Sequence, residues 1–180
     1  QLMTPDEVLG IATEFVKYGV NKIRLTGGEP LVYREFDDVF ERLSLLGVSM
    51  HLTTNGVFLH NHLEKLIAHG LKDVNISLDT LKSARFKEIT RRDSAKIVLQ
   101  NIQKAIDAGL KVKVNCVIMR GVNDDEIIDM IELTRDLPIS LRFIEFMPFD
   151  KNSWAYEKAV LMEDIVEIAS EEYAGLQPLS

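Results

Sequence analysis

Cysteine is nearly absent from this sequence, since Cys116 is the only one among 180 residues. A lone cysteine excludes an internal disulfide framework and indicates a reducing compartment such as the cytoplasm. The sequence also lacks an apolar run long enough to cross a bilayer, and its first residues lack the basic start and apolar stretch of a signal peptide. Acidic residues outnumber basic ones, giving a net charge of −7. We therefore expect neither a nucleic-acid nor a membrane surface, although a few focused cations suffice to bind a small anion.

What the sequence does contain is a regular alternation of strand and helix signals. The first helix begins at the capping residues Thr4 and Glu7 and stops near Gly19. Apolar stretches predict strands at 22–25, 49–54, 73–78, 111–119 and 140–147. Helical periodicity predicts further helices at 36–46, 62–69, 83–90, 95–108, 124–135 and 163–171. This rhythm predicts an α/β fold with a parallel sheet and right-handed connections.

The predicted strands differ from those of an ordinary buried parallel sheet, which are apolar throughout. Side chains alternate between the two faces of a strand, so four of the five strands have one apolar and one polar face. The polar face includes Arg24, Thr53, Ser77 and Lys113. It is either a solvated face of an open sheet or the lining of a barrel interior that holds a polar ligand. The mixture of Arg, Thr, Asn, Ser and Lys favours the lining, because ligands of such folds bind at the carboxyl ends of strands.

The strongest local signal is the turn Gly27-Gly28-Glu29-Pro30, directly after the first strand. Two glycines let the backbone approach a ligand closely and present its peptide groups, while the proline stiffens the turn. Taken alone, these four residues could equally form a tight surface turn that carries a glutamate. The turn gains weight because other strands also end in polar segments, among them 53–56 (TTNG) and 74–79 (VNISLD).

Five segments occur in a fixed order: 22–31 (KIRLTGGEPL), 53–56 (TTNG), 74–79 (VNISLD), 111–120 (KVKVNCVIMR) and 141–147 (LRFIEFM). As a set they resemble the radical S-adenosylmethionine superfamily and, within it, the GTP 3′,8-cyclase family of molybdenum cofactor biosynthesis. The resemblance covers about residues 1–150. It implies a partial (β/α) barrel of TIM type with five strands retained. It also implies conversion of GTP to (8S)-3′,8-cyclo-7,8-dihydroguanosine 5′-triphosphate, the first step toward molybdopterin.

The resemblance further implies which residues bind ligands. S-adenosylmethionine would be bound at its methionine end by the glycine turn and at its nucleoside by later strands, through Gly27, Gly28, Glu29, Ser77 and Met147. GTP would be bound through Arg24, Thr53 and Lys113. The two cations would neutralise phosphate charge, and Thr53 would add a hydrogen bond. Strand alternation independently assigns these three residues to the polar face.

The sequence departs from the family in its cysteines. The family binds one [4Fe-4S] cluster through a Cys-x3-Cys-x2-Cys loop after the first barrel strand and a second through cysteines near its C-terminus, and neither group is present here. Cys116 falls on the apolar face, so we expect it to pack in the core. No residue is therefore assigned to a metal.

These departures predict a chain cut at both ends. Its barrel core would span residues 1–150, and a truncated helical segment would follow at 151–180. We expect the chain by itself to take up no iron and to cleave no S-adenosylmethionine. The strand at 22–25 would lack a neighbour, and such an edge invites pairing with a second copy as a homodimer. If the source is eukaryotic, the expected location moves to the mitochondrial matrix.

Several alternatives stay open. Another radical S-adenosylmethionine maturase would act on a peptide, which does not require two phosphate-binding cations. A non-catalytic module would only bind a nucleotide or S-adenosylmethionine. His51 could touch the ligand or be a satisfied core histidine, and Glu145 could join the site or pair with a nearby cation. The spacing of His60 and His62 favours a polar turn over a metal site, because no third ligand lies nearby in the sequence.

Overall fold

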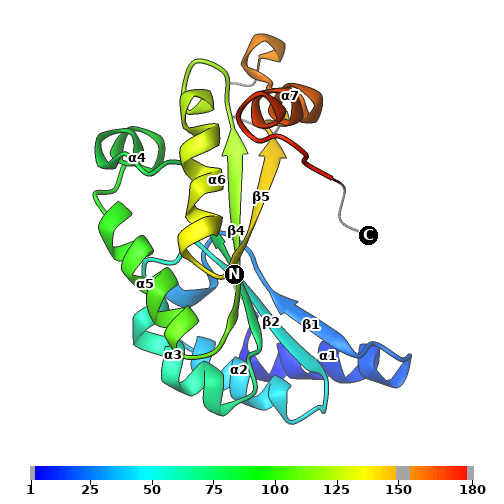
Figure 1. The fold of residues 1–180 in the computed structure, drawn as a ribbon. Helices are drawn as coiled ribbons and strands as arrows, with labels where there is room; N and C mark the ends of the chain where they lie inside the picture. The colour runs from blue at the N-terminus through cyan, green and yellow to red at the C-terminus, as the bar shows by residue number, and fades with distance from the viewer. Residues whose placement is uncertain (1–2, 149–154, 178–180) are drawn as a thin grey trace. The chain divides into compact units, whose positions relative to one another are not determined.

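The computed structural model describes residues 3–148 and 155–177. Figure 1 shows the course of the chain, in which strands and helices alternate. The strands are β1 (Lys22–Leu25), β2 (Ser49–Thr54), β3 (Asp73–Ser77), β4 (Lys111–Ile118) and β5 (Ile139–Glu145). The α-helices are α1 (Pro5–Lys17), α2 (Phe36–Ser44), α3 (Leu59–Ala68), α4 (Ser83–Thr90), α5 (Ala95–Asp107), α6 (Ile127–Asp136) and α7 (Met162–Glu172). Short 3-10 helices are η1 (Pro30–Val32), η2 (Asp124–Glu126) and η3 (Tyr156–Lys158).

The five predicted strands and seven predicted helices are all present. Helix α1 begins with the expected capping box, in which Thr4 accepts from the Glu7 backbone and Glu7 accepts from the Thr4 backbone. Helix α3 begins three residues before the predicted start because Phe58, at its N-cap, makes no side-chain capping bond and so leaves no sequence signal. The helix predicted at 124–135 opens as η2 and continues as α6.

The strands form one sheet in the order β1-β2-β3-β4-β5. Strand β1 pairs with β2 in parallel, and β2 pairs with β3 in parallel. Each strand therefore lies beside its successor in the chain, as repeated right-handed βα units require. This open five-stranded sheet confirms the predicted α/β class and fits a partial barrel, with β1 at one edge.

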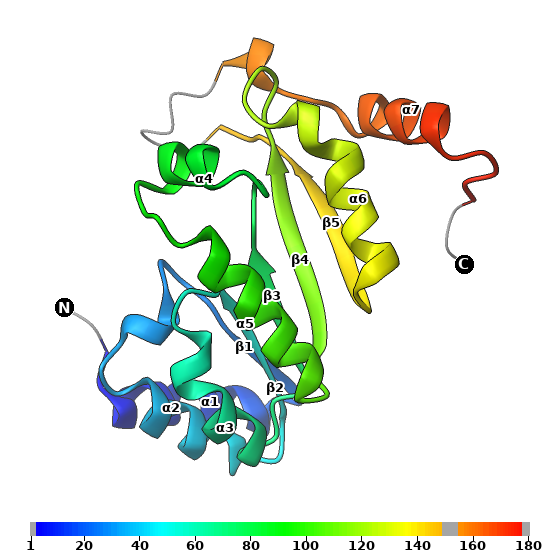
Figure 2. The same cartoon turned by 60° about the vertical axis from the view of Figure 1, so that its left-hand side comes forward.

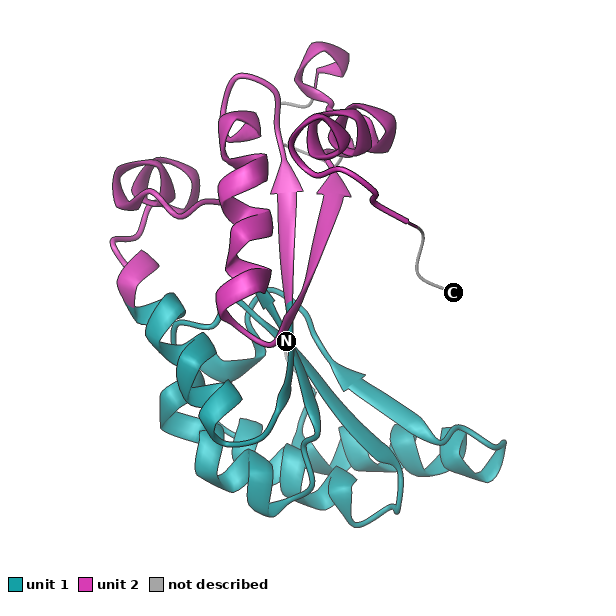
Figure 3. Ribbon diagram, viewed as in Figure 1, with its two compact units in different colours: residues 1–77, 97–113 teal, residues 78–96, 114–180 magenta. Residues whose placement is uncertain are grey.

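The chain divides into two compact units, coloured separately in Figure 3. Unit 1 comprises residues 1–77 and 97–113, and unit 2 comprises residues 78–96 and 114–180. The domain boundary expected near residue 150 falls at residues 149–154, which lie outside the described residues, so it stays a prediction.

Unit 1 packs its helices on the apolar face of its strands. Helix α2 contacts α1, α3 and β2, and Figure 2 shows these three helices along one side of β1 and β2. Beneath them lie fully buried side chains of β2 and β3, namely Met50, Leu52, Val74 and Ile76. The opposite face is buried in its middle, because His51, Asp73 and Asn75 are only 6%, 8% and 7% exposed, whereas Ser77 at the end of β3 is exposed. Burial of polar groups costs free energy unless they are paired, so this face is typical of a site lining rather than of a water-facing surface.

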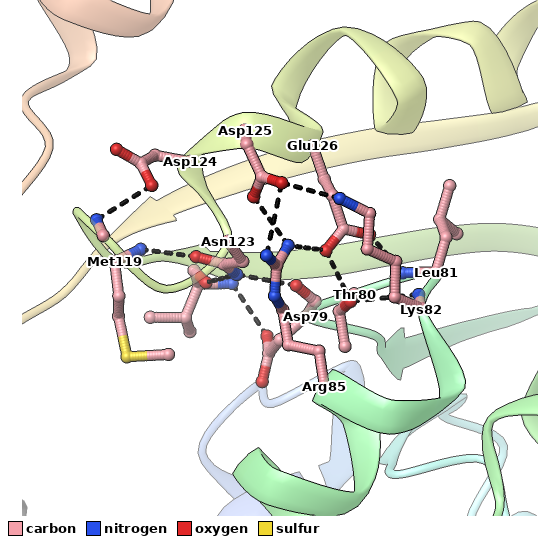
Figure 4. A network of polar contacts seen from close by, with 12 residues as sticks. Asp79, Thr80, Leu81, Lys82, Arg85, Met119, Asn123, Asp124, Asp125 and Glu126 are labelled. Carbon is pink, nitrogen blue, oxygen red and sulfur yellow. Dashed lines mark hydrogen bonds and ion pairs between the residues drawn. The ribbon is translucent and has the colours of Figure 1, made fainter.

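Unit 2 packs α6 against β5 and α7. Cys116 of β4 is fully buried and confirms the predicted core role. A polar network in this unit ties the loop after β3 to η2 (Figure 4). Buried Glu126 accepts from the Thr80 hydroxyl at 2.6 Å and from the Leu81 backbone at 2.8 Å. No helix in the described part of the chain is long and apolar enough to cross a membrane.

Candidate functional site

The turn after β1 is held in place by its own glutamate. Glu29 Oε1 accepts from the Thr54 hydroxyl at 2.7 Å and from the Leu31 backbone at 3.1 Å. Its other oxygen accepts from the Asn55 backbone at 2.6 Å. Both carboxylate oxygens are therefore used to fix the turn to the end of β2. Glu29 thus shapes the turn, and the binding of S-adenosylmethionine at Gly27, Gly28 and Glu29 stays a prediction.

Gly27 and Gly28 present backbone to open space. A Cβ added to either residue would meet no atom within 4 Å outside its immediate neighbours. Gly27 has φ +142°, which disfavours any side chain there, whereas Gly28 lies outside the positive-φ range. Neither packing nor backbone conformation therefore requires a glycine at position 28. A side chain there would instead obstruct a ligand that approaches the backbone. The turn thus fits a ligand that hydrogen-bonds to peptide groups, such as the methionine end of S-adenosylmethionine.

A cavity of about 670 Å³ adjoins this turn on the helical side. Its lining combines residues 25–30 with mostly apolar side chains of α1, η1 and α2, including Val8, Phe36 and Val39. It does not reach Arg24, Thr53 or Lys113. We therefore do not assign this cavity to the substrate cations.

A row of polar side chains crosses the other face of the sheet in unit 1. Strand register aligns Arg24 of β1 with His51 of β2, and His51 with Asp73 of β3. Arg24 Nη2 lies 3.4 Å from Asp73 Oδ1, and Arg24 Nη1 donates to the Leu52 carbonyl at 3.3 Å. His51 Nδ1 lies 2.5 Å from Asp73 Oδ2. The contact is close, but His51 Nδ1 is not aligned with Asp73 as a hydrogen bond.

Lys113 joins this row from β4. Its Nζ lies 3.9 Å from Asp73 Oδ1, beyond hydrogen-bond distance but within ion-pair range. Burial raises the pKa of the Asp73 carboxyl, but His51, Lys113 and Arg24 outweigh burial and hold the pKa below its ordinary value. Two of the three residues predicted for GTP, Arg24 and Lys113, therefore converge on one carboxylate. The sequence prediction missed Asp73, because its position beside both cations depends on strand register.

Thr53, the third of these residues, is half-buried one pleat further along β2 and aligns with Asn75 of β3. Asn75 Oδ1 is buried and has no hydrogen-bond partner among residues 3–148 and 155–177. An unpaired buried acceptor is costly, so Asn75 is a further candidate contact for a donor group of a ligand. Strand alternation places it on the polar face, but no feature of the sequence singles out its amide. Ser77 is exposed at the end of β3.

The remaining candidates lie in unit 2. Met147 is half-exposed just beyond β5. Glu145 Oε1 accepts from the Met162 backbone at 2.8 Å, which gives this residue a role at the start of α7. Asp79 accepts from the Val117 backbone at 2.9 Å, and burial raises the pKa of its carboxyl.

The network of Figure 4 is fully paired within unit 2 and offers no comparable convergence of loosely held cations. Asn123 donates to the Asp79 and Val117 carbonyls at 2.6 and 2.8 Å. Asp125 pairs with Lys82 and Arg85 at 2.6 Å, and the Arg85 hydrogen bond is the main cause that lowers the Asp125 pKa to about 2. These contacts fix the two loops to each other.

The residues present do not fit an iron–sulfur cluster. Burial raises the pKa of the Cys116 thiol, whereas cluster iron requires several thiolates. The histidines at 60 and 62 are engaged elsewhere: His62 pairs with Asp37, and the His60 ring contacts Asn101. Within the described residues, no group of three or more His, Cys, Asp or Glu side chains could hold a metal ion.

Comparison with protein families gives one match across most of the chain. Residues 1–134 match the model of the radical SAM superfamily. Among solved structures, Streptococcus suis SuiB has a TM-score of 0.77 at 18% identity, over 96% of this chain and 41% of that one. Methylornithine synthase has a TM-score of 0.71 at 16% identity, over 94% of this chain and 53% of that one. At these identities the two structures support the fold alone.

Curated relatives are much closer in sequence. The chain is 48% identical to mouse molybdenum cofactor biosynthesis protein 1 over 99% of its length, and it spans 28% of that protein. It is 47% identical to the mitochondrial GTP 3′,8-cyclase of Arabidopsis thaliana over 98% of its length, spanning 46% of that protein. For the GTP 3′,8-cyclase of Clostridium perfringens the identity is 44% over 96% of this chain and 53% of the relative. The chain thus spans about half the length of the cyclases or less.

Proposed function

The chain belongs to the radical S-adenosylmethionine superfamily, and we propose that it forms the nucleotide- and cofactor-binding core of a GTP 3′,8-cyclase of molybdenum cofactor biosynthesis. The similarity to relatives with that name supports the proposal. The protein would act in the cytoplasm or, in a eukaryotic cell, in the mitochondrial matrix, and the Arabidopsis relative is named as mitochondrial.

The observation that carries the proposal is the convergence of Arg24 and Lys113 on the polar face. Both cations lie within 4 Å of the Asp73 carboxylate, so one phosphate group could reach both. A guanidinium offers a planar fork of donors, and an ammonium adds a compact charge, which together suit a triphosphate. Thr53 lies one pleat along the same face and supplies a hydroxyl for a further hydrogen bond. A peptide substrate would not require two such cations.

We assign S-adenosylmethionine to the glycine turn, with Glu29 holding the turn and the Gly28 backbone receiving the methionine end. Ser77 and Met147 are proposed contacts for the nucleoside and the adenine. Once bound, and reductively cleaved in the whole protein by an electron that the residues of this chain do not supply, S-adenosylmethionine would provide the radical that removes hydrogen from the GTP ribose. The residues of this chain would bind and orient the nucleotide and shield it from water. They do not fit a cluster, so no step is assigned through one.

Isotope transfer tests the reaction. The whole protein encoded by the gene would be reconstituted anaerobically and incubated with S-adenosylmethionine and GTP deuterated at C3′ of the ribose. We expect deuterium to appear in 5′-deoxyadenosine. Formation of unlabelled 5′-deoxyadenosine without consumption of GTP would refute GTP as the substrate.

A substitution at Gly28 tests the cofactor assignment. Gly28→Val should abolish cleavage of S-adenosylmethionine, because the new side chain occupies the open space in front of the backbone while meeting no internal atom at its Cβ. Gly10→Val is the matched control, since Gly10 in α1 also has open space at its Cβ and no positive φ. Thermal melts should show both variants folded. Wild-type cleavage in Gly28→Val would make the turn structural only.

A further inference from the structure

Asp73 of β3 lies among three basic side chains, two from the neighbouring strands β2 and β4 and one from β1, which lies beyond β2. Arg24 faces it from β1, His51 from β2 and Lys113 from β4. Its side chain is 11% exposed, and those of Arg24 and Lys113 are 27% and 25% exposed. A charge in such a partly dry environment acts strongly on its neighbours, because water screens it poorly.

The contacts indicate that Asp73 acts on the two cations mainly through its charge. Arg24 Nη2 donates a long hydrogen bond to Asp73 at 3.4 Å, but Arg24 also has an independent anchor, since its Nη1 donates to the Leu52 carbonyl. Lys113 lies at 3.9 Å, too far for a hydrogen bond. The shortest contact of Asp73 is with His51, whose Nε2 lies 3.0 Å from the Ser49 hydroxyl. His51 and Ser49 therefore help fix the carboxylate where it faces both cations.

We propose that Asp73 is a positioning residue that acts through Arg24 and Lys113, competing with the phosphate groups of an anionic ligand for the two cations. This inference rests on the proposed function, because it takes Arg24 and Lys113 as the phosphate-binding pair. A phosphate that reaches either cation must share it with a carboxylate a few ångströms away. Like charges at this separation repel, so Asp73 lowers the affinity of the site for polyphosphate.

Removal of the charge should therefore strengthen binding. In Asp73→Asn the side chain keeps its size and one oxygen acceptor but loses its negative charge. Calorimetry on the whole protein, with inorganic tripolyphosphate as the probe, should show binding at least about fivefold tighter than in the wild type, the low end of the usual coupling between neighbouring sites. A purely structural role for Asp73 would give the opposite sign. Guanosine, which carries no phosphate, should bind both proteins equally.

The chain offers a matched control in Asp37 of α2. Asp37 also pairs with a histidine and a lysine, at 2.6 and 2.7 Å, so Asp37→Asn makes the same change of net charge in a similar setting. It should leave tripolyphosphate affinity unchanged. Asp73→Glu keeps the charge and should bind within about twofold of the wild type, a difference that corresponds to about 0.4 kcal/mol.

The outcomes separate this inference from the proposed function. Tripolyphosphate binding that is insensitive to Lys113→Ala would refute the phosphate pair itself. Binding that depends on Lys113 but is unchanged or weaker in a folded Asp73→Asn would refute only the role of Asp73. If Asp73→Asn fails to fold, carboxyl-carbon NMR on the wild type decides: saturating tripolyphosphate must raise the midpoint of Asp73 titration, and an unmoved midpoint overturns the inference.

Discussion

Two clusters in unit 1 have the same ingredients, an aspartate, a histidine and a lysine, yet they differ in how closely the cations approach. In the cluster between α2 and α3, Asp37 meets His62 at 2.6 Å and Lys65 at 2.7 Å. On the polar face of the sheet, Asp73 meets His51 at 2.5 Å, but Lys113 stays at 3.9 Å. Because the histidine contacts are nearly equal, the difference lies in the lysines.

Exposure sharpens this comparison. The Lys65 side chain is 66% exposed, whereas that of Lys113 is 25% exposed. An exposed ammonium is hydrated and gains little from a further anion. A partly buried ammonium such as that of Lys113 has lost hydration without gaining a close anionic partner. A phosphate would therefore stabilise it more than it would stabilise an exposed ammonium. Similar residues thus join two helices in one place and, under the proposed function, would bind a ligand in the other.

The largest expected effect comes from removing Lys113, and removal of Lys65 is the matched control. In the whole protein, Lys113→Ala should weaken GTP binding by about 1.5–3 kcal/mol, the range for losing a charged hydrogen bond, which is about 10- to 150-fold in Kd. Lys65→Ala should leave GTP affinity unchanged, and neither variant should alter S-adenosylmethionine binding. Isothermal titration calorimetry with each ligand measures this. Equal losses for GTP and S-adenosylmethionine in Lys113→Ala would contradict the assigned role.

A smaller effect is expected when lysine replaces Arg24, because the positive charge is kept and the planar set of guanidinium donors is lost. Arg24 uses one Nη for the Leu52 carbonyl and the other for Asp73, a pair of directions that one ammonium cannot reproduce. Arg24→Lys should weaken GTP binding about fivefold, close to 1 kcal/mol for one net hydrogen bond. Arg42 also bridges two acceptors, Asp38 and Asp6, but on the helical surface. Arg42→Lys should therefore bind GTP like the wild type, and a loss there as large as in Arg24→Lys would remove the distinction between the two arginines.

The sequence predicts which side chains share the polar face, but not which of them lie next to each other. Strand alternation is a local property, so the order of residues along each strand is enough to group Arg24, Thr53 and Lys113 on one face. The importance of Asp73 depends on the register that aligns it with His51, and register is set by pairing between distant strands. Nothing within the segment around residue 73 encodes that alignment.

The same limit applies to the fold. The five strands are predictable because apolar stretches and turn residues mark them locally. The early start of α3 is not, since its N-cap, Phe58, makes no side-chain bond. The sequence prediction also misses η1 as a 3-10 helix: it is capped by Glu29, whose carboxylate additionally binds Thr54 and Asn55 at the end of another strand. Features fixed by long-range contacts are those that sequence patterns do not reveal.

The smallest expected effect concerns stability and tests whether the helical cluster is structural. Burial raises the pKa of the Asp37 carboxyl, but Lys65 and His62 outweigh burial and hold it below its ordinary value. A carboxylate with a lowered folded pKa stabilises the protein above its unfolded pKa, and this stabilisation is lost as the pH falls through the folded value. Asp37→Asn should therefore lower the free energy of unfolding at pH 7 by up to about 1 kcal/mol, because solvent screens the exposed Lys65. Urea unfolding at pH 7, 5 and 3 should show the difference in unfolding free energy between wild type and variant shrinking below about pH 4.

Tripolyphosphate serves as a control. It should not change how this free-energy difference depends on pH, whereas it should raise the midpoint of the Asp73 titration. A difference that persists undiminished at pH 3 would mean that Asp37 acts through packing rather than through its charge, and the contrast between the two clusters would then lose its electrostatic basis.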